Sequence, residues 1–61
     1  MKRSDLLHHL EAHGCVLLRE GGKHTVYRNQ TTQQSATVPR HKENKNPTAI
    51  RICKDLGVPR P

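Results

Sequence analysis

The stretch CVLLREGGKHTVYRN, residues 15–29, carries the clearest local signal in the chain. Within it, residues 15–19 and residues 24–29 are short runs rich in β-branched, aromatic or other apolar side chains, and such runs are typical of strands. Gly21 and Gly22 lie between the runs and suit the positive φ angles of a two-residue hairpin turn. The stretch therefore predicts two antiparallel strands joined by a tight turn.

The turn also predicts the register of this hairpin. With the two glycines as the turn residues, Leu17 lies opposite Val26, and Arg19 lies opposite His24. Val26 is then expected in the core. His24 is expected at the exposed end of the hairpin, beside a cation.

The segments on either side of the hairpin have helical signals. Residues 5–13 are preceded by Ser4, a good N-cap, and followed by Gly14, a good C-cap. Further along, Asn46 is the expected N-cap of a second helix, with Pro47 at its first position. The apolar residues of each segment fall on one face: Leu6, Leu7 and Leu10 in the first, and Ala49, Ile52, Cys53 and Leu56 in the second.

Two further signals complete the order of elements. Residues 35–39 read as a third short strand that ends at Pro39, and Gly57 ends the second helix. The predicted fold is α+β in the order α-β-β-β-α, a three-stranded antiparallel sheet with two helices on one face. This is the double-stranded-RNA-binding-domain kind of fold, expected as a single domain of residues 1–61. Its expected core consists of Leu6, Leu10, Val26, Ile52 and Leu56.

The composition restricts the classes of function. The chain has 61 residues, with 11 Lys and Arg against 5 Asp and Glu, which gives a net charge of +6. Such a balance favours polyanions, so nucleic acid is the first candidate partner. Tyr27 is the one aromatic residue among Phe, Trp and Tyr, so a platform that stacks single-stranded bases is disfavoured. Binding to RNA is expected to depend on phosphate contacts and on salt.

The N-terminus and the cysteines indicate the compartment. The charged start MKRSDLL has no apolar segment after it, so we expect a cytoplasmic protein and no membrane partner. Cys15 and Cys53 lack the Cys-x-x-Cys spacing of zinc sites, which predicts buried, reduced thiols. His9 and His13 have the i, i+4 spacing of a chelating pair, but no third ligand is near in sequence, and no metal site is expected.

His24 stands just past the hairpin glycines, where a turn and a strand have no structural need for an imidazole. An unperturbed imidazole titrates at about pH 6.5, so it can accept or donate a proton near neutrality. Cleaving RNA without a metal requires a base for the ribose 2′-hydroxyl, an acid for the leaving oxygen and cations near the phosphorus. Lys23, Arg19 and Arg28 are the candidate cations. The alternative is an exposed hairpin histidine without a function.

A second basic stretch follows the third predicted strand. His41 lies there between Arg40 and Lys42, in an irregular segment where contacts to phosphates are natural. An ordinary loop histidine is an equally good interpretation of His41.

The chain resembles the HicA family of toxins, the small mRNA-cleaving partners of HicB antitoxins. The resemblance is carried by four stretches in order: HLEAHG, LLREGGKHTVYRN, TVPRHKE and AIRICKDLGVP. It implies a double-stranded-RNA-binding-like fold, ribonuclease activity and a catalytic histidine after the hairpin glycines, which is His24. The chain departs from the family pattern at four positions: Lys23, Gln30, Gln33 and Asn44. The changes in the loop and before the second helix put contacts with a partner in question more than the chemistry.

The resemblance thus implies the toxin of a type II toxin–antitoxin system. The expected activity is metal-independent RNA endonuclease, with His24 as catalyst and no cofactor, on mRNA as substrate. The expected RNA-binding residues are Lys23, Arg28, Arg40, His41 and Lys42. A HicB-like antitoxin is the expected inhibitor, with a monomer when free and a hetero-oligomer in the complex. The alternatives are a catalytically inactive RNA-binding module and a basic protein-interaction domain.

Overall fold

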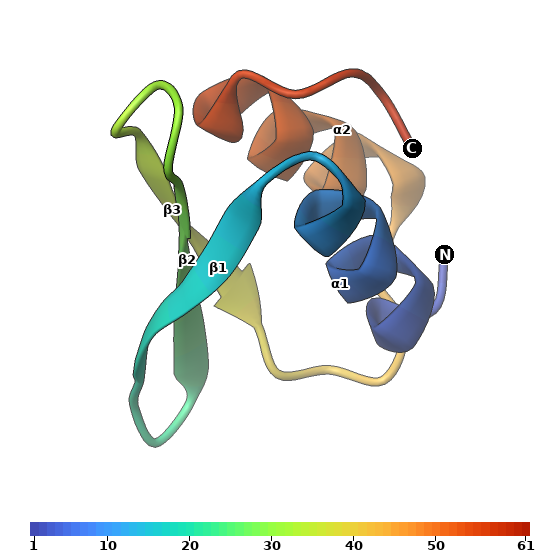
Figure 1. Cartoon of the computed structure of the whole chain (residues 1–61). Coiled ribbons are helices and arrows are strands. Elements are labelled where there is room, and N and C mark those ends of the chain that lie inside the picture. The colour runs from blue at the N-terminus through green and yellow to red at the C-terminus, as the bar shows by residue number, and fades with distance from the viewer.

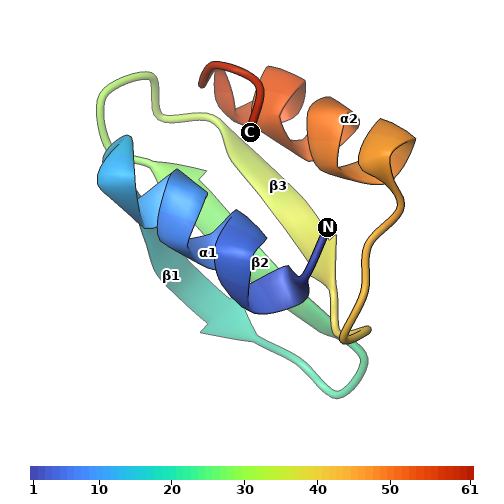
Figure 2. The ribbon, with the colours of Figure 1, turned by 90° about the vertical axis from the view of Figure 1, so that its right-hand side faces the viewer.

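Two helices enclose three strands in the computed structural model, which describes residues 1–61 (Figure 1). In chain order the elements are α1 (Arg3–Ala12), β1 (Cys15–Glu20), β2 (His24–Asn29), β3 (Ser35–Pro39) and α2 (Asn46–Leu56). The strands form an antiparallel sheet in the order β1-β2-β3. Both helices cover the same face of this sheet, and the other face is left uncovered (Figure 2). The predicted fold class is confirmed.

Nine buried apolar side chains form the core between the helices and the sheet. They are Leu6, Leu10, Cys15, Tyr27, Val38, Ala49, Ile52, Cys53 and Leu56. Four of the five predicted core residues are among them, and the prediction for Val26 is wrong. Val26 is partly exposed, while its neighbours on β2, Thr25 and Tyr27, are buried. Side chains alternate between the two faces along a strand, so β2 turns the opposite face inward from the one predicted.

The register of the hairpin accounts for this difference. Leu17 pairs with Tyr27 and Arg19 pairs with Val26, so both predicted pairs are wrong. The register shifts between Leu17 and Arg19 because Leu18 is an additional residue on β1, a β-bulge. A change of one residue in register exchanges the two faces of a strand.

The turn of the hairpin also differs from the prediction. The amide of Gly21 donates to the carbonyl of His24 at 2.8 Å, which places the turn between these two residues, one residue later than expected. Neither Gly21 nor Gly22 has a positive φ angle, so the predicted positive φ angles are wrong as well. The glycines with positive φ lie at the C-terminal ends of the helices, as predicted there: Gly14 at +83° and Gly57 at +72°.

Polar side chains on the inner face of β2 bind both helices. Asn29 is buried, and its Nδ2 donates to the carbonyl of Leu56, the last residue of α2, at 2.7 Å. Its Oδ1 accepts from the amide of Thr31 at 2.9 Å and so shapes the loop that leads to β3. The hydroxyl of Tyr27 donates to Glu11 of α1 over 3.4 Å. The bond from Asn29 thus satisfies a carbonyl at the C-terminal end of α2 that has no partner inside the helix. The bond from Tyr27 links β2 to α1.

The predicted side-chain caps at Ser4 and Asn46 are wrong. Both residues lie inside their helices, and neither helix has a side-chain hydrogen bond at its N-cap. The start of α1 is held instead by the backbone of a distant segment. The amide of Arg3 donates to the carbonyl of Lys42 at 2.8 Å.

The predicted burial of the two cysteines is confirmed. Cys15 and Cys53 are buried and form no disulfide. Burial raises the pKa of both thiols above the usual value, which keeps them protonated and weakly nucleophilic. Among the helices, α1 and α2 are both too short and too polar to span a bilayer.

Asn44 is buried without a complete set of hydrogen bonds. Its backbone amide donates to the carbonyl of Met1 at 2.9 Å, which holds the N-terminal residue beside Asn44. Only 3% of Asn44 is exposed, and its Nδ2 has no hydrogen-bond partner. This is one of the positions at which the chain departs from the expected family pattern. A buried polar atom without a partner costs about 1–3 kcal/mol.

We expect Asn44→Leu to stabilise the fold by about 1 kcal/mol, because leucine has a similar volume and no amide to desolvate. For a domain of this size that gain corresponds to a rise in melting temperature of about 4–8 °C. Asn29→Leu is the matched control, since Asn29 is equally buried but its Nδ2 and Oδ1 both form hydrogen bonds. It should lower the melting temperature by leaving the partners of Asn29 unsatisfied. Thermal melts that move in the same direction for both variants would contradict this account.

Candidate active site

His24 is the first residue of β2 and lies exposed at the end of the sheet. It pairs with Pro39, the last residue of β3. Because the two strands are antiparallel, the start of β2 lies beside the end of β3. Arg40 and His41 directly follow Pro39, so the basic segment predicted to bind phosphate begins next to the predicted catalytic residue.

A hollow of about 330 Å³ opens at this junction. It is lined by Gly22, Lys23, His24, Pro39, Arg40 and His41. We call it the His24 hollow. Two imidazoles and two cations face this one space, from two segments that are distant in the sequence. Four of the six residues predicted for the site are thus brought together.

The remaining two predicted residues lie elsewhere. Lys42 lines a neighbouring hollow that also includes Arg40. Arg28 lies four residues along β2 from His24, about 13 Å at the usual rise of a strand. Its guanidinium bonds to Gln33 in the loop before β3. The structure therefore places Arg28 at the far end of the sheet from the His24 hollow.

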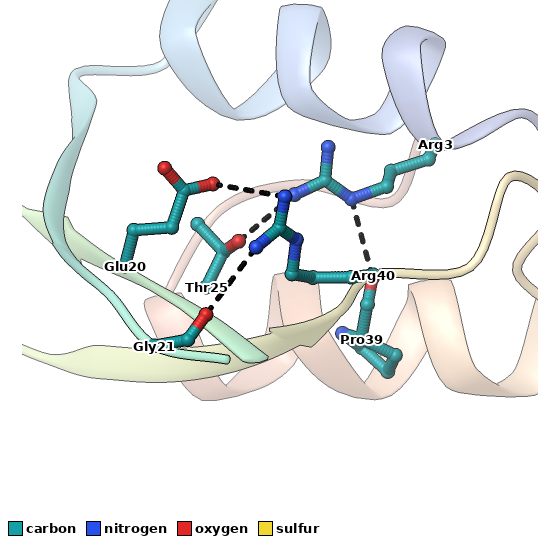
Figure 3. A network of polar contacts seen from close by, with 6 residues as sticks. All are labelled: Arg3, Glu20, Gly21, Thr25, Pro39 and Arg40. Carbon is teal, nitrogen blue, oxygen red and sulfur yellow. Dashed lines mark hydrogen bonds and ion pairs between the residues drawn. The ribbon is translucent and has the colours of Figure 1, made fainter. Parts of the chain in front are cut away.

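Arg40 is held over the hairpin by two contacts (Figure 3). Its Nη1 donates to the carbonyl of Gly21 at 3.3 Å, and its Nη2 lies 3.8 Å from Oε1 of Glu20. The side chains of Arg40 and Glu20 are 47% and 50% exposed. An exposed ion pair of this length contributes little, typically about 0–1 kcal/mol. An anion that enters the hollow can therefore take the place of Glu20 at small cost.

Arg3 positions the site from outside the hollow, a role that the sequence patterns do not reveal. From the first turn of α1, its Nη2 donates to Oγ1 of Thr25 at 2.9 Å, and its Nε donates to the carbonyl of Pro39 at 3.3 Å (Figure 3). Thr25 follows His24 on β2, and Pro39 precedes Arg40. Arg3 therefore fixes the two strand ends that carry the His24 hollow, a role that depends on where α1 lies over the sheet.

The side chains around the His24 hollow are suited to an anionic substrate. Lys23 and Arg40 provide positive charge, and guanidinium N–H groups form strong hydrogen bonds with phosphate oxygens. His24 and His41 provide imidazole nitrogens, which can serve as general acid or base. No group of three or more His, Cys, Asp or Glu side chains lies together in the protein in a way that could hold a metal ion.

His9 and His13 lie far from this hollow in the sequence and are occupied by other contacts. The two rings lie with their centroids 4.6 Å apart and are tilted by 52° relative to each other. Nε2 of His9 lies 2.8 Å from the carbonyl oxygen of Pro59, and Nδ1 of His13 lies 2.9 Å from the carbonyl oxygen of His9. A carbonyl only accepts, so each of these nitrogens carries a proton and is not available to a metal.

The chain matches one family model, which is described as "HicA toxin of bacterial toxin-antitoxin". The match covers residues 3–58 of the 61 residues and so includes all five elements and the His24 hollow. No curated protein and no solved structure matches the chain significantly.

We expect Arg3→Ala to destabilise the fold by about 1–3 kcal/mol, because the buried hydroxyl of Thr25 loses its partner. Thr25→Val removes the hydroxyl and should cost less, and adding Arg3→Ala to it should then have a smaller effect than in the parent. The double-mutant cycle, followed by thermal melting, measures this coupling. Strictly additive effects of the two substitutions would show that the Arg3–Thr25 bond does not hold the strand ends.

Proposed function

The chain belongs to the HicA toxin family of bacterial toxin–antitoxin modules, and from this membership we propose that it is an RNA endonuclease that acts at the His24 hollow. The family gives the chain the role of the toxin and implies an antitoxin partner. The observation that carries the proposal is the common hollow of His24, Lys23, Arg40 and His41.

The proposed reaction is an internal transfer of the phosphodiester. A base removes the proton of the ribose 2′-hydroxyl, and the resulting oxygen attacks the adjacent phosphorus. The bond from phosphorus to the 5′-oxygen of the next nucleotide breaks, and an acid protonates that oxygen as it leaves. The products are a 2′,3′-cyclic phosphate and a 5′-hydroxyl. Cations near the phosphorus stabilise the negative charge that accumulates on its oxygens.

The side chains of the His24 hollow can fill each of these roles. We assign His24 as one member of the acid–base pair and His41 as the other, because they enter the same hollow from different segments. The base and the acid act on different oxygens of the phosphodiester, so two side chains that enter the hollow from different segments suit the reaction. Lys23 and Arg40 are the cations for the phosphate. No step in this scheme requires a metal ion or a cofactor.

The proposed substrate is mRNA in a single-stranded state. Tyr27 is 5% exposed and points towards Glu11 of α1, so its ring cannot stack on a base. Recognition would then depend on the charged backbone of RNA and weaken as salt rises, by about 0.7 in the log–log slope for each phosphate contacted. The remaining predicted RNA-binding residues, Arg28 and Lys42, would act outside the His24 hollow.

The proposed inhibitor is a HicB-like antitoxin. A basic toxin surface favours a partner that presents acidic side chains, since complementary charge steers association. Binding to the folded toxin would also stabilise it by mass action. The proposed complex is a hetero-oligomer.

We expect His24→Ala to lower the rate of RNA cleavage by about 100-fold or more, the range that one placed acid or base contributes. Its melting temperature should be close to that of the parent, because His24 is exposed and belongs to no buried cluster. RNA affinity should persist, because Lys23 and Arg40 remain. The measurements are cleavage in the presence of EDTA, RNA binding and thermal melting, all on the same preparation.

His8→Ala is the control for this experiment, since His8 is an exposed histidine of α1 outside the His24 hollow. It should cleave RNA at the parental rate. If His24→Ala also cleaves at that rate with an unchanged melt, His24 is not the catalyst and His41→Ala is the next variant to measure. A parent protein that binds RNA without cleaving it would favour the inactive binding module, and one that does neither would favour the protein-interaction domain.

We expect expression of this chain alone to arrest growth, and co-expression of a cognate HicB-like antitoxin to reverse the arrest. The purified pair should melt at a higher temperature than the toxin alone, because the antitoxin binds only the folded toxin. Growth curves with inducible expression of each gene test the first statement, and melts at increasing antitoxin concentration test the second. Normal growth at high levels of folded parent protein would count against a toxic activity.

A further inference from the structure

A second hollow of about 500 Å³ lies next to the His24 hollow. It is lined by Lys2, Arg3, Ser4, Arg40, Lys42 and Glu43, without any apolar side chain. We call it the Lys2 hollow. Arg40 lines both hollows, so a molecule that extends past Arg40 passes from one into the other.

Backbone contacts between distant segments build the Lys2 hollow. Lys2 forms an isolated antiparallel bridge with Glu43, and the amide of Arg3 donates to the carbonyl of Lys42 at 2.8 Å. These contacts hold the basic start of α1 against the basic segment that follows β3. Neither segment alone indicates the site, because half of its charge comes from each.

The charge of the Lys2 hollow is largely uncompensated. Four cations line it, and of these Arg40 lies 3.8 Å from the carboxylate of Glu20 outside the hollow. The one carboxylate in the lining is that of Glu43, and its Oε1 lies 3.3 Å from the amino group of Met1. Lys2 and Lys42 are exposed, and neither forms an ion pair in the structure. Like charges that the backbone holds together repel one another, and an anion bound between them relieves that repulsion.

Arg3 gives the Lys2 hollow a rigid donor. Two of its N–H groups are used by Thr25 and Pro39, and a guanidinium has five, so three remain for a ligand. Because its orientation is already fixed, little side-chain entropy is lost when Arg3 binds an anion.

We propose that the Lys2 hollow binds a second phosphate of the RNA strand, the one next to the phosphate that is cleaved in the His24 hollow. This inference rests on the proposed function, and it adds Lys2, Arg3 and Ser4 to the RNA-binding surface. The second phosphate contributes to binding of the substrate and of the transition state alike, because it takes no part in the reaction. Its loss therefore raises KM and leaves kcat nearly unchanged.

The test compares short RNAs that share one cleavable phosphodiester. One RNA has no other phosphate, and the other two carry an additional terminal phosphate on the 5′ side or on the 3′ side. We expect one of the two additions to lower KM by about tenfold or more, the factor that one contact to a charged group provides. In the variant Lys2→Ala/Lys42→Ala that advantage should disappear, with kcat close to the parental value.

Lys54→Ala is the matched control, because Lys54 is an exposed lysine of α2 that lines neither hollow. It should keep the full advantage of the additional phosphate. Cleavage of all three RNAs with the same KM by the parent would overturn the second subsite and leave the proposed ribonuclease function in place.

A binding experiment keeps the inference independent of cleavage. Oligonucleotides with 2′-deoxy sugars cannot react, and those with one or two phosphates can be titrated into the labelled protein and followed by amide NMR. With the second phosphate present, the amides of Lys2, Ser4 and Lys42 should shift, and the affinity should rise by about tenfold. If only the amide resonances of residues that line the His24 hollow shift, the inference is overturned, whether or not the parent cleaves RNA.

Discussion

The inner face of β2 determines how the other elements are arranged. Three of its side chains carry polar groups into the interior, and each is paired with a helical residue: Thr25 with Arg3, Tyr27 with Glu11, and Asn29 with Leu56. A buried polar group without a partner is costly, so these three bonds allow few positions for the helices. The apolar core is small and directs packing less strictly, since dispersion and burial have no preferred direction. The central strand thus orients both helices against the sheet.

The same constraint determines which residues face outward. Once Thr25 and Tyr27 point inward, their neighbours on β2 belong to the exposed face or to its end, and His24 is among them. Arg3 then links the inner face to the candidate site, because its guanidinium binds Thr25 on one side and the carbonyl of Pro39 on the other. The geometry of the His24 hollow therefore depends on a helix that contributes no side chain to it. A substitution in α1 can alter the site without contacting it.

Local signals were enough to predict the elements of this fold. The bounds of β2 and β3, the two helices and their terminal glycines follow from β-branched runs and apolar periodicity. The register of the hairpin was not predictable in this way, because hydrophobicity alone favours Val26 as the inward residue. Thr25 is buried in its place because Arg3 supplies a partner, and that contact exists only in the folded chain. The predicted cap at Ser4 is wrong for a similar reason, since the start of α1 is held by the backbone of Lys42, which is distant in the sequence.

The candidate site, like the fold, was predictable from the sequence only in part. The proximity of His24 to Arg40 and His41 follows from the antiparallel order of the strands and was implicit in the predicted meander. The separate position of Arg28 follows from its distance along β2. By contrast, the contribution of the N-terminal residues depends on pairing between residues distant in the sequence, Lys2 with Glu43 and Arg3 with Lys42. Local patterns contain no information about such pairing.

The bulge at Leu18 has a consequence for the chain at high concentration. β1 is an edge strand, and its segment from Val16 to Leu18 is apolar and between 39% and 52% exposed. A flat edge of this kind can recruit further copies strand by strand and grow into fibrils. The bulge interrupts the regular spacing of amides and carbonyls along that edge, and the charges of Arg19 and Glu20 follow directly after it. The pairing of β1 with a second copy, which is the first step of open-ended aggregation, is thereby hindered, although no other element covers this edge of the sheet.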